Sequence, residues 1–194
     1  TAGALEIGPE RQATTGVEPA PGRGTGGGAY CWTPSGGFIV AGKDGELWLH
    51  EGARIRQLTT FGRSCRAPAT DGRHVVYAVD EAEVWRTDLD TGEHDRLDDG
   101  TDAFCFDPSI SPDGRIVSWQ GWSPPDMPWD GSVRVDCDLH TGVIREWKLA
   151  DGAVQQPLVE RIRCAVDPDG EDVRGNDPDR PCGERDAEHR ETLG

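Results

Sequence analysis

The stretch "CFDPSISPDGRIVSWQ" at residues 105–120 decides the fold, because its parts recur in the same order at two earlier places. Each copy opens with Cys-x-x-Pro, as "CWTP" at Cys31, "CRAP" at Cys65 and "CFDP" at Cys105. A turn follows ("PSGG", "ATDG", "SPDG"), and then an apolar strand pattern ("FIVAG", "HVVYAVD", "RIVSWQ"). Recurrence of turn and strand signals in a constant order indicates repeated structural units rather than unrelated hairpins.

Each unit continues with two more strand patterns. The third strands are "GELWLH" from Gly45, "AEVWRTDL" from Ala82 and "GSVRVDCDL" from Gly131, and the fourth are "ARIRQLT", "EHDRLDD" and "VIREWKL". Four strands joined by Asp-Gly or Thr-Gly turns predict an antiparallel meander. The opening cysteines are 34 and then 40 residues apart, which is near the length of a propeller blade. We therefore predict an all-β fold, a partial β-propeller of four-stranded antiparallel blades.

The repeats divide the chain into three parts. Residues 28–157 are predicted to hold about three propeller blades, and residues 1–27 a linker or a poorly repeated blade. Residues 158–194 read either as a degenerate fourth blade, starting with "CAVDPDG" at Cys164, or as a disordered acidic tail. From residue 165 onward there are ten Asp or Glu, four Arg and few large apolar residues. Such a segment buries too little apolar surface to offset its ordering entropy, so we expect disorder there.

Charge and hydropathy exclude several classes of protein. The net charge of -16 would repel a phosphate backbone, so we expect no nucleic-acid partner. No run of eighteen apolar residues exists, and we expect no membrane span. The first residues lack a basic region followed by an apolar core, so we expect a cytoplasmic protein. Because the chain begins with Thr, a processed or truncated start stays open.

The sequence predicts no metal site, cofactor or catalytic residue. Cysteines at equivalent places in successive repeats are too far apart for disulfides, and we expect them to be buried and reduced. There is no C-x-x-C for zinc, and "DPDGED" at Asp167 departs from a calcium loop at the positions held by Asp172 and Pro178. The five histidines are scattered, and pairing one with Ser111 or Ser123 is less plausible than turn serines and surface histidines.

An insertion at residues 121–131, "GWSPPDMPWDG", interrupts the third unit between its second and third strands. The earlier units fill the same joint with "KDG" and "DEA". One interpretation is a Pro-rich loop that folds back over an exposed blade edge. The other is that Trp122, Met127, Trp129 and Asp130 line a contact with a partner domain or with a substrate chamber.

These repeats resemble the "SPDG" blades of Tol-type propellers and of the prolyl oligopeptidase family. The stretch "SPDGRIVSWQGWSPPDMPWDGSVRV" is similar to the blade of bacterial dipeptidyl and acylaminoacyl peptidases that carries an "MPWDG" loop, and "GGGAY" at Gly26 is similar to another phrase of those propellers. The resemblance covers about residues 24–157. In that family the propeller caps an α/β-hydrolase domain with a Ser–Asp–His triad. Only the cap is implied here, because the sequence has no G-x-S-x-G elbow and no βαβ pattern.

The resemblance implies the non-catalytic propeller portion of a serine peptidase-like protein, in truncated form, that gates or docks peptide substrates. Its implied partners are a hydrolase domain or a peptide. The alternative is a stand-alone Tol-type propeller that acts as a protein-binding scaffold. Closed rings normally have four to eight blades, so about three blades would leave open edges, and we expect self-association through them.

Overall fold

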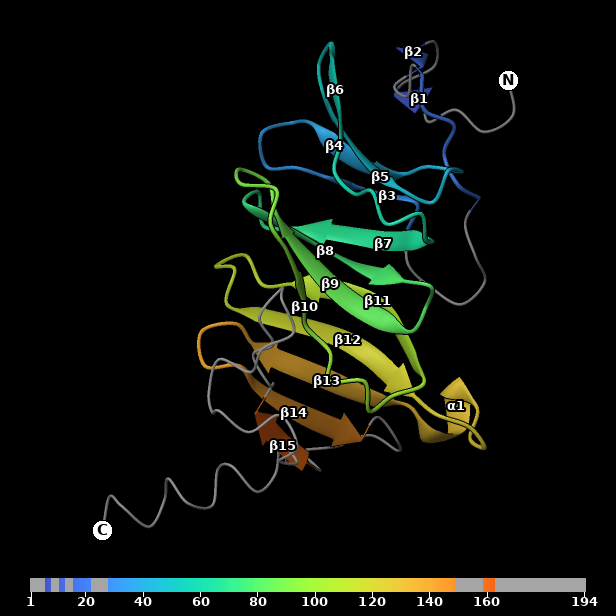
Figure 1. The fold of residues 1–194 in the computed structure, drawn as a ribbon, viewed down its shortest axis with the longest axis vertical. Helices are drawn as coiled ribbons and strands as arrows, with labels where there is room; N and C mark the ends of the chain where they lie inside the picture. The colour runs from blue at the N-terminus through green and yellow to red at the C-terminus, as the bar shows by residue number, and fades with distance from the viewer. Residues whose placement is uncertain (1–5, 8–10, 13–15, 22–27, 149–158, 163–194) are drawn as a thin grey trace.

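The computed structural model describes residues 6–7, 11–12, 16–21, 28–148 and 159–162, and it shows three antiparallel sheets stacked along the longest axis (Figure 1). We call the sheets blades 1, 2 and 3. Blade 1 pairs its strands in the order β3 (Tyr30–Trp32), β4 (Phe38–Ala41), β5 (Leu47–Glu51) and β6 (Arg54–Gln57).

Blades 2 and 3 repeat this meander. Blade 2 consists of β7 (Cys65–Thr70), β8 (His74–Val79), β9 (Glu83–Asp88) and β10 (His94–Arg96). Blade 3 consists of β11 (Phe104–Ile110), β12 (Ile116–Trp122), β13 (Val133–Asp138), β14 (Val143–Lys148) and β15 (Val159–Ile162). A hairpin of β1 (Glu6–Ile7) and β2 (Arg11–Gln12) precedes them. The all-β prediction is confirmed, and the fold is a partial β-propeller.

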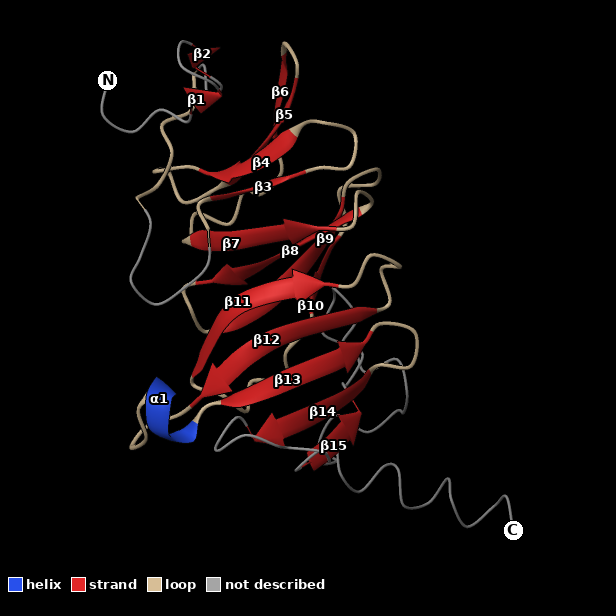
Figure 2. Ribbon diagram, turned by 180° about the vertical axis from the view of Figure 1, so that it is seen from behind, coloured by secondary structure: helices blue, strands red, loops and turns tan. Residues whose placement is uncertain are grey.

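Two elements differ from the sequence-based prediction. Blade 3 has a fifth strand, because β15 pairs antiparallel with the otherwise open edge of β14. The insertion is not loop throughout, since it ends in the one-turn helix α1 (Pro128–Gly131), where proline is tolerated in the first turn (Figure 2). The unit predicted from Cys164 lies outside the described residues. Among the described residues, no helix is long and apolar enough to cross a membrane.

Separate apolar cores join the blades. The core between blades 1 and 2 holds Cys65, and the core between blades 2 and 3 holds Cys105. Both cysteines are free and buried, as expected from their repeated position, whereas Cys31 is free but only half-buried. Burial raises the pKa of the Cys65 thiol to about 11, so this cysteine behaves as a small apolar side chain.

The Cys-x-x-Pro phrase forms the same β-bulge in blades 2 and 3. The register between the first two strands shifts after Arg66 in blade 2 and after Phe106 in blade 3. The residue before each proline is left-handed, with φ 52° at Ala67 and φ 49° at Asp107. In blade 1 the phrase instead ends the short strand β3, where the Thr33 amide donates to the Gly37 carbonyl at 2.8 Å.

A repeated backbone hydrogen bond also links successive blades. The amide of Cys65 donates to the carbonyl of Gly45, and the amide of Cys105 donates to the carbonyl of Glu81, each at 2.8 Å. Both acceptors lie in the short turn between the second and third strands of the preceding blade. In blade 3 that turn is replaced by residues 123–132, which contain most of the insertion. The insertion therefore occupies the joint that blades 1 and 2 use to hold their successors.

Candidate functional site

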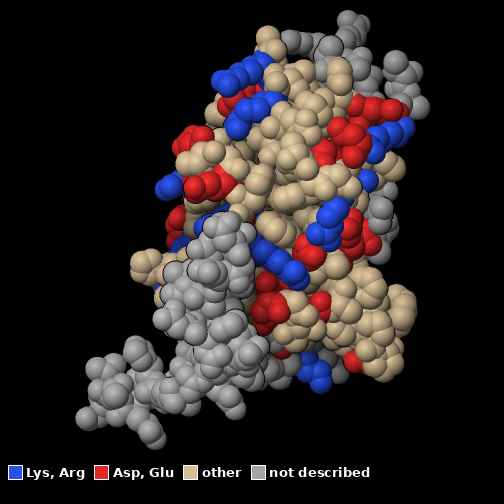
Figure 3. Space-filling model, in the orientation of Figure 1, with Lys and Arg blue, Asp and Glu red and all other residues tan. Residues whose placement is uncertain are grey.

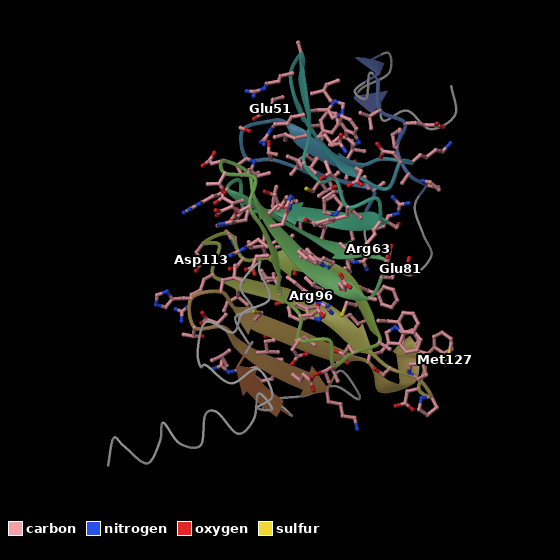
Figure 4. All side chains as sticks on the ribbon, in the orientation of Figure 1. Glu51, Arg63, Glu81, Arg96, Asp113 and Met127 are labelled. Carbon is pink, nitrogen blue, oxygen red and sulfur yellow. The ribbon has the colours of Figure 1, made fainter. Side chains whose placement is uncertain are left out.

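The insertion leaves β12 at Trp122 and projects from the end of blade 3 before returning into β13. Met127, labelled in Figure 4, lies beside α1 at this outer end, across the sheets from Asp113 in the "SPDG" turn. The turn of α1 closes through the Gly131 amide, which donates to the Met127 carbonyl at 3.1 Å. A Cβ at residue 131 would lie 2.4 Å from Asp126 Oδ2, so this close return requires glycine.

The predicted contact residues of the insertion differ strongly in exposure. Trp129 is 76% exposed and Met127 is 41% exposed, which are high values for such large apolar side chains. Trp122 is half-buried, and the side chain of Asp130 lies outside the described part of the structure. Exposure of Trp129 is what a contact loop requires, whereas an edge cover would bury it.

Trp122 belongs to the blade rather than to the exposed tip. Its ring stacks on Phe104 at 4.5 Å between centroids and 13° between planes, and Phe104 is paired with it across β11 and β12. Phe106 extends the stack, 6.2 Å from Phe104. The sequence analysis missed these two phenylalanines, although they flank the repeated cysteine in "FCFDP". The three stacked rings anchor the start of the insertion on blade 3.

The base of the insertion is also tied by hydrogen bonding. Ser123 Oγ accepts the amide of Ala103 at 2.9 Å, which connects the insertion to the segment that enters β11. By contrast, the indole nitrogen of Trp122 is buried with no hydrogen-bond partner, and such a donor costs about 1–3 kcal/mol. Figure 3 shows a mainly uncharged area at the position of α1, bordered by charged side chains. The outer end of blade 3 thus presents apolar surface on a molecule of net charge -16.

Two of the groups that could suggest a hydrolase, Ser111 and His74, have structural partners. Ser111 Oγ donates to Asp113 Oδ1 at 2.6 Å and accepts the Ile116 amide at 2.8 Å within its turn. His74 Nδ1 lies 3.1 Å from Asp71 Oδ2, and burial in blade 2 holds both side chains in place. Within the described ranges, no three His, Cys, Asp or Glu residues come together as metal ligands would. In the described part of the insertion, Met127 and Trp129 present exposed apolar side chains.

The tryptophans of the third strands in blades 1 and 2 pack on different apolar clusters. Trp85 packs against the core between blades 1 and 2, and its indole donates to Glu83 at 2.8 Å. Trp48 packs on the other side of blade 1, against Val17, Phe38 and Val40. The equivalent positions of the two tryptophans in the repeat predict packing between blades; Trp85 packs in this way, whereas Trp48 packs on the face of blade 1 that points away from blade 2.

Comparison with known proteins identifies no family. No family model matches the chain, and no curated protein resembles it. Among solved structures, TolB from Acinetobacter baumannii superposes with a TM-score of 0.49 at 16% identity, covering 62% of this chain and 32% of that one. The tricorn protease gives 0.46 at 19% identity, covering 57% and 11%. Oligogalacturonate lyase from Vibrio parahaemolyticus gives 0.42 at 17% identity, covering 63% and 45%.

The chain spans less than half the length of each of these proteins. Superpositions this loose carry no functional argument. The propeller fold is established by the strand order of the three blades themselves, and the function is inferred below from the chain's own surfaces.

Proposed function

We propose that this chain is a non-catalytic β-propeller module that binds a protein or peptide partner through the tip of the insertion, Met127 and Trp129. The observation that carries the proposal is the 76% exposure of Trp129. A large aromatic side chain held away from its own core is the kind of residue that dominates binding energy when a partner buries it. The hydrogen bonds of Ser111 and His74 within their turns support a non-catalytic role.

The insertion is suited to this role because its conformational freedom is limited. Pro124 and Pro125 follow Ser123, Pro128 follows Met127, and each proline ring restricts φ. The stacked rings of Trp122 and Phe104 anchor its start at the end of blade 3. A stiff, anchored segment loses less entropy when a partner orders it than a free loop would.

The partner is a hydrolase domain or a peptide substrate if the resemblance to prolyl oligopeptidase-like propellers carries to this chain. In that case the module would gate or dock peptides for a serine peptidase-like protein. The alternative is a stand-alone Tol-type scaffold that binds other proteins. Both roles use the same exposed residues, and both leave this chain without a nucleophile of its own.

A stability comparison tests whether Trp129 is free for a partner. We expect Trp129→Ala to reduce the free energy of unfolding by less than about 1 kcal/mol, because an exposed side chain contributes little to the fold. Trp122→Ala, the matched control in the aromatic stack, should cost at least about 2 kcal/mol. Urea unfolding followed by circular dichroism measures both. A loss of several kcal/mol in Trp129→Ala would show internal packing and contradict the proposal.

A binding experiment then tests the proposed role directly. Random peptides displayed on phage are selected on the immobilised full chain, and the selected peptides are measured again on Trp129→Ser. We expect the variant to bind these peptides at least about tenfold more weakly, the usual effect of losing an aromatic anchor. Equal binding by both proteins would refute the site, and labelling of any serine by a fluorophosphonate probe would refute the non-catalytic role.

A further inference from the structure

The two ends of the blade stack differ in chemistry. Each blade has an upstream face, toward the N-terminal side of the stack, and a downstream face. Side chains alternate between the two faces along a strand, and the strand pairings identify which positions are equivalent in the three blades. The central positions of a blade are those on its second and third strands. On the downstream face they are mostly apolar in blade 1 (Ile39, Ala41, Leu47, Leu49) and blade 2 (Val76, Ala78, Val84, Arg86). In blade 3 they are Ser118, Gln120, Arg134 and Asp136.

The downstream face of blade 3 is polar where those of the first two blades are mostly apolar. Asp136 accepts a hydrogen bond from Ser118 Oγ and pairs with Arg134 Nε at 2.7 Å. The side chain of Arg134 is 55% exposed. A terminal repeat with a polar outer face is the way stacked repeats end without exposing a core. The central positions of this face are therefore polar, and two of its large rings, Phe104 and Trp122, stack on each other beside them.

The upstream face of blade 1 is the opposite case. Its four central positions hold Phe38, Val40, Trp48 and His50. The equivalent positions of blade 2 include Val75 and Tyr77, and those of blade 3 include Val117 and Trp119; these four side chains are all buried in the cores between blades. The upstream face of blade 1 thus has the composition of an interface between blades.

This face is only partly covered in the structure. Val17 packs on Phe38, Val40 and Trp48, but the neighbouring Trp32 stays 50% exposed. Two more large side chains of the same face, Tyr30 and Ile55, are 40% and 39% exposed. Aromatic rings run continuously across it, with Tyr30 and Trp32 at 6.2 Å, Trp32 and Phe38 at 5.7 Å, and Phe38 and His50 at 4.6 Å.

We propose that a second copy of this chain docks on the upstream face of blade 1. The two copies are related by a two-fold axis, and Tyr30, Trp32 and Ile55 of one copy pack against the same residues of the other. Blade 1 is electrically neutral between residues 28 and 57, where three basic and three acidic residues cancel. Two copies can therefore approach through this blade in spite of the net charge of -16. A two-fold contact uses the same patch on both copies and stops at a dimer.

Head-to-tail stacking of copies fits the surfaces less well. In that arrangement the rings of Tyr30 and Trp32 in one copy would pack on the Arg134–Asp136 ion pair of the next copy. Burying that ion pair under rings removes its water, and the lost hydration exceeds what the pair regains. The central positions of the downstream face of blade 3 are therefore a poorer partner for the rings of blade 1 than a second copy of the upstream face.

The expected dimer is weak. A face of four short strands measures roughly 250 Å² in projection, from strand spacing and rise per residue, which is small beside the roughly 800 Å² per partner of a standard interface. We therefore expect a dissociation constant in the micromolar range. Sedimentation velocity of the full chain from about 1 µM to about 100 µM should show monomer converting to dimer.

Two variants test the face, and a third is the control. Trp32→Ser should weaken the dimer by about 30-fold or more, and Ile55→Glu should do the same by placing like charges across the axis. Circular dichroism melts verify that each variant is folded; if Trp32→Ser unfolds, Ile55→Glu decides. Trp129→Ser removes an equally large exposed ring at the other end of the stack and should leave the dimer intact.

The remaining outcomes overturn the inference. A chain that stays monomeric over the whole concentration range has no such contact, and the face then fits a different β-sheet rather than a second copy. Growth beyond the dimer indicates head-to-tail stacking. Loss of the dimer in Trp129→Ser alone assigns self-association to the insertion. None of these results depends on the peptide-binding proposal, since that proposal is tested on Trp129 and this one on Trp32 and Ile55.

Discussion

Glu46 holds the segment that leads from blade 1 to blade 2 with one buried carboxylate. It accepts the Thr59 hydroxyl at 2.6 Å, the Gly62 amide at 2.6 Å and the Phe61 amide at 3.2 Å. The Thr59 hydroxyl in turn accepts the Leu47 amide at 2.8 Å. Side chains thus satisfy backbone donors at the point where strand pairing ends, which a buried segment requires.

Removing the Glu46 carboxylate should lower the free energy of unfolding more than removing an exposed side chain does. Glu46→Ala leaves the buried Thr59 hydroxyl and the amides of Phe61 and Gly62 without their acceptor, so we expect a loss of about 1–3 kcal/mol in the free energy of unfolding. Glu51→Ala, at an exposed residue of the same blade, should change it by less than about 0.5 kcal/mol. Urea denaturation measures both. Equal losses would mean that Glu46 has no special role.

At the scale of the element, the repeated bulge puts a non-glycine residue in a left-handed conformation twice. Ala67 and Asp107 precede the prolines of "CRAP" and "CFDP" and have φ near 50°. L-residues pay for this conformation with contacts of the Cβ atom, at about 1–2 kcal/mol. The bulge bends the first strands of blades 2 and 3.

Glycine should therefore be tolerated at the bulge and harmful beside it. We expect Ala67→Gly to leave the free energy of unfolding unchanged or to raise it by up to about 1 kcal/mol, because relief of the left-handed strain offsets the added chain entropy. Ala69→Gly, two residues further along β7, should lower it by about 0.5–1 kcal/mol. Thermal melting compares the two. If Ala67→Gly lowers the free energy of unfolding more than Ala69→Gly does, the inference that Ala67 is strained is wrong.

For the whole molecule, several carboxylates are held in turns and between strands with a pKa below the ordinary value. Burial opposes the effect at Asp138, but hydrogen bonds from Arg115 and from the amides of Thr141 and His140 outweigh it and lower the pKa. At Asp88 the Thr91 amide is the main cause of the lowered pKa. The carboxylates with a lowered pKa are Asp71, Asp80, Glu83, Asp88, Asp113 and Asp138.

These shifts predict acid lability. The unfolded chain takes up protons at its carboxylates near pH 4, whereas the folded chain takes them up at lower pH. The stability they contribute is therefore present above about pH 4 and is lost as the pH falls through the lowered values. We expect the urea concentration at the midpoint of unfolding to decrease as the pH is lowered below about 4. In the double variant Asp88→Asn/Asp138→Asn this decrease should be less steep. A double variant with the wild-type pH dependence would contradict this assignment.

The repeat itself could be predicted from the sequence alone. In a meander each strand pairs with the next one along the chain, so the order of turns and strands from Cys31 to Lys148 is local information. The insertion was located at the correct joint for the same reason. The equal burial of Cys65 and Cys105 followed from their equal place in the repeat.

Contacts between segments far apart in the chain required the tertiary structure. Trp122 and Trp129 are seven residues apart in one insertion, yet one stacks on Phe104 and the other is exposed. Nothing local distinguishes them, because the partner ring belongs to another strand. In the same way, the register of the strands decides that Ser118 and Arg134 share one face at one end of the stack. A residue's exposure depends on what the rest of the chain brings against it, and a short sequence pattern does not contain that information.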